Sequence, residues 1–196
     1  RDLPKVCRHL HLPVQSGSSR ILQAMRRRHT RDEYLKLVEE VRYMLPNVAL
    51  STDMIIGFPG ESKNDFEETL SLAAQVGYHS MFSFKYSERP NTLASARLVD
   101  DVPAAAKTQR IVALQELQKS IQTELHQQRV GTEPEVLVDS VSRKRQSDLA
   151  GRTSENTVVN FQAAPEFLGQ LVRVKITNSG PFSLHGRLLQ SPTDQA

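Results

Sequence analysis

The sequence is poor in cysteine, has no long apolar run and carries little net charge. Its one cysteine, Cys7, excludes an internal disulfide framework and is typical of the reducing cytoplasm, where we expect this protein to act. No stretch of about eighteen apolar residues occurs, so we expect no membrane-spanning helix. The formal net charge of +3 is too small to argue for nucleic-acid binding. A binding site for RNA or DNA must therefore rest on local basic clusters.

The length and composition are those of a globular protein with two domains. A chain of 196 residues with 38% hydrophobic content is long enough to bury a core and suits a medium domain followed by a small one. The pattern changes near Gly131, and we expect domains over residues 1–130 and 131–192. The chain begins with Arg1 and not with Met, and we expect it to be the C-terminal piece of a longer, monomeric protein.

The first domain is predicted to alternate strands and helices. Thr30 with Glu33, and Ser62 with Asp65, have the spacing of capping boxes that open helices. Strands separated by helices of this length imply right-handed crossovers and a parallel sheet. A long helix is expected from Pro103 to about residue 129. The expected strands cover residues 10–14, 49–57 and 81–86.

The second domain is predicted to be all β. Short strands separated by turns favour a small barrel or sandwich. Four strands are expected, at residues 136–138, 157–161, 171–176 and 184–189.

Three strand ends carry residues suited to a ligand site. They are residues 15–17, 57–61 and 87–89, and the carboxyl ends of parallel strands open onto one mouth. Asp53 is an acid inside an otherwise apolar strand, where it needs a partner or a ligand. Taken alone, the Gly-Phe-Pro-Gly run at 57–60 is equally well explained as a tight turn from strand to helix.

Three ordered motifs resemble those of the MiaB-type methylthiotransferases. Residues 9–30 resemble one, residues 50–61 resemble the family's Leu-Ser-Thr-Asp-x-Ile-x-Gly-Phe-Pro-Gly-Glu strand, and residues 86–92 resemble its Tyr-Ser-x-Arg-x-Gly-Thr loop. Asn91 departs from that loop, in which glycine is common. The resemblance continues into a β module similar to a TRAM domain, with Ala-Gly-Arg-Thr at 150–153, and so covers nearly the whole chain.

This resemblance implies a radical S-adenosylmethionine enzyme that modifies tRNA. The implied fold is part of a partial (β/α) barrel followed by a small OB-like TRAM barrel. Enzymes of this family place a methylthio group on C2 of isopentenyl-adenosine beside the anticodon, and the expected RNA partner is the anticodon stem-loop. The whole enzyme holds two [4Fe–4S] clusters and receives electrons from a donor protein. The resemblance places no catalytic residue and no metal ligand in this chain.

The same resemblance assigns residues to the cofactor and to the substrate. S-adenosylmethionine is expected beside Gln15, Ser16, Asp53 and Ile55, and close to Gly57 and Glu61. Arg89 is expected to reach the substrate or to hold its loop. The residues of the β module expected to contact RNA are Arg143, Lys144, Arg145, Arg152, Arg173 and Lys175.

The sequence leaves alternatives open for the RNA contacts, the substrate and the class of the protein. Basic and acidic residues are equally numerous after residue 130, so charge alone favours a solvated surface there. The basic loop at 26–29 is either solvated or in contact with RNA phosphate. A related group acting on threonylcarbamoyl-adenosine has similar motifs, although residues 51–53 and 13–17 favour isopentenyl-adenosine. A non-catalytic RNA-binding protein is the alternative from another class, and an upstream Cys-x-x-x-Cys-x-x-Cys would decide against it.

The single cysteine predicts how much iron the chain alone can bind. A [4Fe–4S] cluster needs several thiolate ligands, and the chain supplies only Cys7. We expect the chain alone to be catalytically inert and to retain far less than one cluster per molecule after anaerobic reconstitution. Iron and sulfide quantification on the desalted protein checks this, and stoichiometric cluster binding would contradict it.

Overall fold

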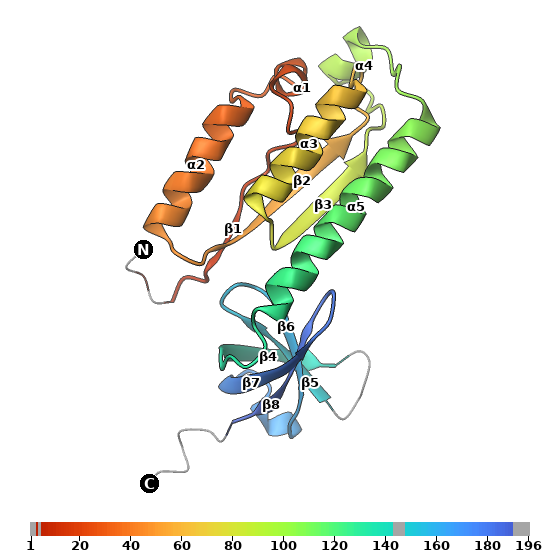
Figure 1. Ribbon diagram of the computed structural model, residues 1–196. Helices are drawn as coiled ribbons and strands as arrows, with labels where there is room; N and C mark the ends of the chain where they lie inside the picture. The colour runs from red at the N-terminus through yellow and green to blue at the C-terminus, as the bar shows by residue number, and fades with distance from the viewer. Residues whose placement is uncertain (1–2, 4, 143–147, 190–196) are drawn as a thin grey trace. The chain divides into compact units, whose positions relative to one another are not determined.

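The computed structural model describes residue 3, residues 5–142 and residues 148–189, which divide into two compact units (Figure 1). Residues 10–121 form one unit, and the residues up to 9 and from 122 onwards form the other. The predicted fold class, a parallel α/β sheet followed by a small β-barrel, is confirmed. The domain boundary expected at residue 130 stays a prediction.

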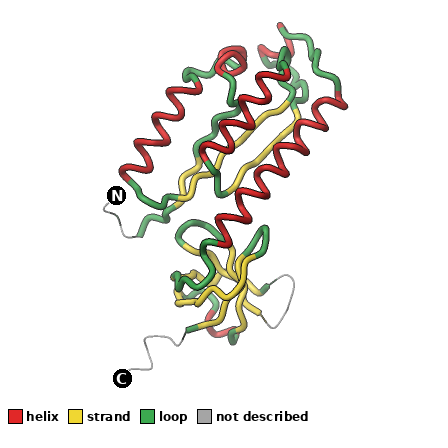
Figure 2. Tube along the Cα trace, in the orientation of Figure 1, coloured by secondary structure: helices red, strands yellow, loops and turns green. Residues whose placement is uncertain are grey.

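The first unit is built on a three-stranded sheet with the order β1, β2, β3. These strands are β1 (His9–His11), β2 (Ala49–Ile56) and β3 (Ser80–Lys85), and β2 and β3 run parallel. Among the described residues no helix is both long enough and apolar enough to span a membrane. The helices are α1 (Ser19–Ala24), α2 (Arg31–Met44), α3 (Lys63–Val76), α4 (Leu93–Arg97) and α5 (Ala104–Gln127) (Figure 2).

Both predicted capping boxes are present and set the starts of the crossover helices. The Thr30 side chain accepts a hydrogen bond from the backbone N–H of Glu33, and Ser62 does the same for Asp65. In each box the acid bonds back to the backbone of the capping residue. Gly77 ends α3 in the left-handed conformation, with φ 60°, as its position predicts.

Helices cover one face of the sheet, and the other face carries polar and aromatic side chains. Leu50, Met54 and Ile56 of β2 are fully buried in a core shared with α2, α3 and α5. Because side chains alternate along a strand, Asp53 and Ile55 point to the opposite face. Their partners on β3 are Phe82 and Phe84, which are 57% and 55% exposed.

The first strand is shorter than predicted. It ends at His11, after which the Leu12 N–H donates to the Ser51 carbonyl at 2.8 Å and an isolated parallel bridge forms at Gln15. The reason is Pro13, which has no N–H to donate to the ladder. The Thr52 hydroxyl compensates by bonding the main chain on both sides of Pro13, at 2.8 and 3.1 Å.

The second unit is a closed barrel of five strands, one more than predicted. The missed strand, β5, contains Gly151, and its Ala-Gly-Arg-Thr run lacks the β-branched alternation that marks the others. A Cβ at Gly151 would lie 2.4 Å from the Leu137 carbonyl oxygen, so glycine allows β4 and β5 to approach. The closed order is β4 (Glu135–Val141), β5 (Asp148–Thr153), β6 (Val158–Gln162), β8 (Leu184–Leu188) and β7 (Leu171–Ser179).

Asp65 ties α1 to the start of α3. Its carboxylate is buried and accepts hydrogen bonds from Ser18, at 2.7 Å, and from Arg20 and Ser62. Burial raises the pKa of Asp65, but these hydrogen bonds outweigh burial and hold the pKa well below its ordinary value of 3.8.

We expect Asp65→Asn to lower the free energy of unfolding at pH 7 by roughly 2 kcal/mol, because hydrogen bonds to a buried carboxylate are lost. A folded-state pKa below the unfolded value adds stability that is present above about pH 4 and is lost as the pH falls through the folded pKa. The variant should therefore lose less stability on acidification than the unchanged chain. Urea unfolding at pH 7 and pH 3 measures both effects.

Glu67→Gln is the matched control for this substitution. Glu67 forms an exposed ion pair with Lys63 at 3.5 Å on the same helix. Its loss should change the free energy of unfolding by no more than about 0.5 kcal/mol. Equal effects of the two substitutions would show that the Asp65 network contributes nothing special.

Candidate functional site

The carboxyl ends of β2 and β3 open onto a cavity of about 380 Å³. Gln15, Asp53, Ile55 and Arg89 all line it, so the structure brings together four of the residues expected at the site. Tyr86, at the end of β3, lines the same cavity. The expectation that the strand ends form one mouth is thus met for these residues, while their ligands stay predictions.

The three residues of the Ser-Thr-Asp run at 51–53 in β2 make different contacts. Thr52 bridges the gap in β1, and Ser51 contacts His11, whose Nδ1 lies 2.9 Å from the serine hydroxyl. The other ring nitrogen of His11, Nε2, lies 3.5 Å from the Asp53 carboxylate, whose side chain is 31% exposed. At this distance and exposure, Asp53 keeps acceptor capacity for a ligand in the cavity.

Gln15 takes an unusual backbone conformation at the rim of the cavity. Its φ is 77°, in the left-handed region that long side chains rarely adopt. Two backbone hydrogen bonds to β2, both 2.9 Å, hold it there, one with Asp53 and one with Ile55. Residues in such conformations cluster at functional sites, which supports a role for Gln15 in the cavity.

Ser16, Gly57 and Glu61 do not line this cavity. Ser16 is buried and accepts a hydrogen bond from the backbone of Ser18 at 3.2 Å. One carboxylate oxygen of Glu61 accepts from the Gly57 N–H at 3.0 Å and from Arg110 at 2.7 Å. Burial raises the pKa of Glu61, and these two donors offset part of the rise. The structure gives these residues a supporting place beside the site, and their contact with the cofactor stays a prediction.

A buried lysine and a partly buried arginine near the start of α5 lie beside the cavity. Lys107 Nζ lies 2.6 Å from both carboxylate oxygens of Asp100 and 5.2 Å from the centroid of the Tyr86 ring. Arg110 bonds Glu61 in the turn after β2. Neither residue is predicted from the sequence, because basic residues at a helix start are usually exposed.

The lining fits a small ligand that carries both hydrogen-bond donors and acceptors, as S-adenosylmethionine does. Asp53 offers an acceptor, and the buried hydroxyl of Tyr86 has no hydrogen-bond partner within the described part of the chain. Burial, followed by Glu88 and Asp100, raises the pKa of Tyr86, so the hydroxyl keeps its proton and can donate.

An iron–sulfur cluster does not fit the residues of this chain. Within residues 3, 5–142 and 148–189, no three His, Cys, Asp or Glu side chains are grouped so as to hold a metal ion. Cys7 is exposed and is the sole cysteine. The ligands of a cluster must therefore come from outside this sequence.

The predicted RNA contacts on the barrel are only partly described. Arg143, Lys144 and Arg145 lie outside the described residues. Arg173 and Lys175 share the outward side of β7, and both approach Glu133, at 3.5 and 3.4 Å. Arg152 approaches Asp139 at 3.4 Å. Each described cation of this set therefore lies near an acid, with Glu133 shared by Arg173 and Lys175.

Two parts of the chain match family models. Residues 1–73 match the model of the radical SAM superfamily, and residues 127–189 match the TRAM domain. The β-barrel lies within the residues that match the TRAM domain, and we name the two units the radical SAM unit and the TRAM barrel after these matches.

Several bacterial proteins named tRNA-2-methylthio-N(6)-dimethylallyladenosine synthase are similar to the chain. The protein of Methylococcus capsulatus is 48% identical over 189 residues, which is 96% of this chain and 41% of the relative. That of Alkalilimnicola ehrlichii is 45% identical over 196 residues, 100% of this chain and 44% of the relative. The chain thus spans about two fifths of the length of these relatives. The resemblance to methylthiotransferases expected from the three motifs is confirmed.

Gly57, in the turn of the radical SAM motif, is required by its neighbours. Its φ is +73°, and a Cβ there would lie 2.3 Å from Cγ of Lys107. Gly77 has a similar φ of +60°, but a Cβ there would meet no atom within 4 Å. Any other residue at either position would have to adopt a left-handed backbone, but only at Gly57 would its Cβ also clash with a neighbouring side chain.

We expect Gly57→Ala to lower the free energy of unfolding by roughly 2–4 kcal/mol, since left-handed strain adds to a clash with a buried side chain. Gly77→Ala should cost only about 1 kcal/mol, from the backbone alone. Chemical denaturation of both variants measures the difference. If Gly57→Ala cost no more than Gly77→Ala, Lys107 would not be held against the turn as described.

Proposed function

We propose that the chain is part of a radical SAM tRNA methylthiotransferase that modifies C2 of an N6-dimethylallyl-adenosine beside the anticodon. The observation that carries this proposal is identity of 45–48% to synthases of that name across 94–100% of the chain. The cavity supports it, because Gln15, Asp53, Ile55 and Arg89 from the three motifs converge there.

The residues of the cavity would bind and orient S-adenosylmethionine. Asp53 accepts hydrogen bonds from an amine or hydroxyl of the ligand, and the Tyr86 hydroxyl donates one. Ile55 supplies apolar contact between them. When bound, S-adenosylmethionine supplies the radical chemistry, with two [4Fe–4S] clusters whose ligands come from outside this chain. An electron-donor protein, cytoplasmic location and a monomeric state belong to the same proposal.

The TRAM barrel would bind the anticodon stem-loop. Such an RNA is recognised through its backbone phosphates and its unpaired bases. Arg152, Arg173 and Lys175 lie on the barrel, and their contacts with acids are long, at 3.4–3.5 Å, and exposed. Exposed ion pairs of this kind are weak, so phosphate can replace the acids at little cost.

A chimera tests the proposed activity. In the Methylococcus capsulatus synthase, the segment that matches this chain is replaced by this sequence, and the protein is produced in a bacterium whose own synthase gene is deleted. We expect tRNA nucleosides from these cells to contain the 2-methylthio derivative of dimethylallyl-adenosine, measured by mass spectrometry. Methylthiolation of threonylcarbamoyl-adenosine instead would assign the chain to the related group.

Asp53→Asn in the same chimera should lower the yield of methylthiolated nucleoside by at least about tenfold, because the negative charge is lost and one acceptor oxygen is replaced by an NH₂ donor. Asp32→Asn, at an exposed position near the start of α2, is the control and should leave the yield unchanged. A full yield from Asp53→Asn would exclude it from the cofactor site. A soluble, folded chimera without any product would favour a non-catalytic RNA-binding protein.

A further inference from the structure

A second cavity, of about 530 Å³, adjoins the first. The two share part of their lining, including Arg27, Ile55 and Phe58, and so form neighbouring parts of one mouth. The second cavity extends away from Asp53 towards the end of α1 and towards α4. Neither helix belongs to the three strand ends at 15–17, 57–61 and 87–89.

Three arginines line the second cavity, and no acid does. Arg26 and Arg27 follow α1, and Arg97 is the last residue of α4. Within the part of the chain that the structure describes, none of these guanidinium groups makes a hydrogen bond or an ion pair. Most other arginines of this unit behave differently; Arg20 and Arg110, for example, bond buried carboxylates. Three unpaired cations around one hollow mark a site for an anion.

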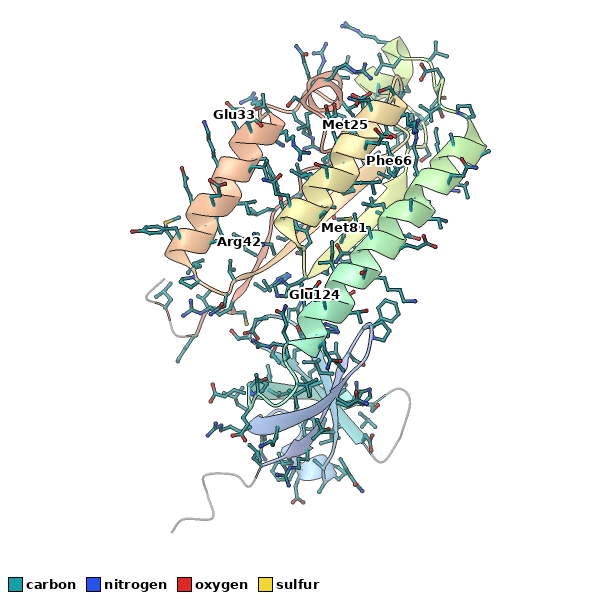
Figure 3. All side chains as sticks on the ribbon, in the orientation of Figure 1. Met25, Glu33, Arg42, Phe66, Met81 and Glu124 are labelled. Atoms are coloured by element: carbon teal, nitrogen blue, oxygen red, sulfur yellow. The ribbon has the colours of Figure 1, made fainter. Side chains whose placement is uncertain are left out.

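The floor of the second cavity is apolar. Phe58 and Leu98 contribute to it, together with Leu93 of α4 and Met25 at the end of α1 (labelled in Figure 3). A cavity with an aromatic ring, aliphatic side chains and guanidinium groups suits a ligand that is flat and apolar at one end and anionic at the other. A nucleotide has this combination.

Arg26 takes the backbone conformation of a residue just past the end of a helix. Its φ is 56°, in the left-handed region that favours glycine. An arginine here costs stability that glycine would not, and no described contact of its side chain repays that cost. The conformation itself ends α1, because the Arg27 N–H donates to the Leu22 carbonyl at 2.9 Å across it.

We propose that the second cavity binds a nucleotide of the RNA substrate, with its phosphates on Arg26, Arg27 and Arg97 and its base on the apolar floor. This inference rests on the proposed function and gives the radical SAM unit its own contact with RNA. Within the basic loop at 26–29, Arg26 and Arg27 are then RNA contacts, whereas Arg28 does not line the cavity.

The carboxylate of S-adenosylmethionine is the other anion within reach. It competes for Arg27, which lines both cavities, but Arg26 and Arg97 line only the second. These two residues therefore distinguish an RNA phosphate from the cofactor.

The test measures binding of a fluorescent anticodon stem-loop RNA to the full 196-residue chain by anisotropy, over a range of salt concentrations. Each of Arg26→Gly, Arg27→Gln and Arg97→Gln should weaken binding about fourfold at 0.15 M salt and reduce the salt slope by about 0.7, the effect of one phosphate contact. Arg28→Gln is the matched control and should bind as the unchanged chain does. Arg26→Gly should also melt at the same or a higher temperature, since glycine relieves the backbone.

Each outcome bears on the inference. Loss of affinity in Arg28→Gln equal to that in the other three would show a diffuse charge effect and would overturn it. A chain that binds RNA while the three variants bind equally well overturns the inference and leaves the proposed function intact. A chain that binds no RNA contradicts the proposed function as well. Weaker S-adenosylmethionine binding by Arg26→Gly and Arg97→Gln, measured by calorimetry with RNA affinity unchanged, would assign the arginines to the cofactor.

Discussion

The contact between Lys107 and Asp100 is the interaction on which the candidate site depends. It anchors the segment after β3 to α5, and that segment carries Arg89 and α4, which line the two cavities. The buried lysine also passes so close to Gly57 that the turn after β2 admits no side chain there. One lysine side chain thus constrains both sides of the mouth: its ammonium group holds Asp100, since a buried charge must keep its partner close, and its aliphatic stem packs on Gly57.

Charge is distributed differently in the two units. On the TRAM barrel, the described arginines and lysines of the predicted RNA set are each near an acid, whereas Arg26, Arg27 and Arg97 around the second cavity have none. A count of charges along the sequence conceals this difference, since it cannot show which cations are already neutralised. Pairing in space, and not net charge, identifies the more strongly attractive surface for an anion.

Much of the framework was predictable, because its signals are local. The capping boxes at Thr30 and Ser62, and the glycine that ends α3, act within a few residues of themselves. The strand predictions failed where residues far apart in the sequence determine the local structure. The Thr52 hydroxyl replaces the sheet hydrogen bonding that is interrupted at Pro13. Gly151 in β5 is explained by the close approach of β4. At the site, the family resemblance predicted that Gln15 and Asp53 lie together. The contacts of Glu61 and Lys107 involve α5, which lies far along the chain.

The TRAM barrel closes through a parallel pair, β6 with β8, while β7 returns between β4 and β8. Hairpin neighbours such as β4 and β5 can pair as soon as both are made. The closing contacts instead join strands separated by β7 and by a full traverse of the barrel, and they carry a large entropic penalty. Closure is then a late, cooperative step of folding, and until it occurs the edges of β6 and β8 are exposed to pairing with other chains.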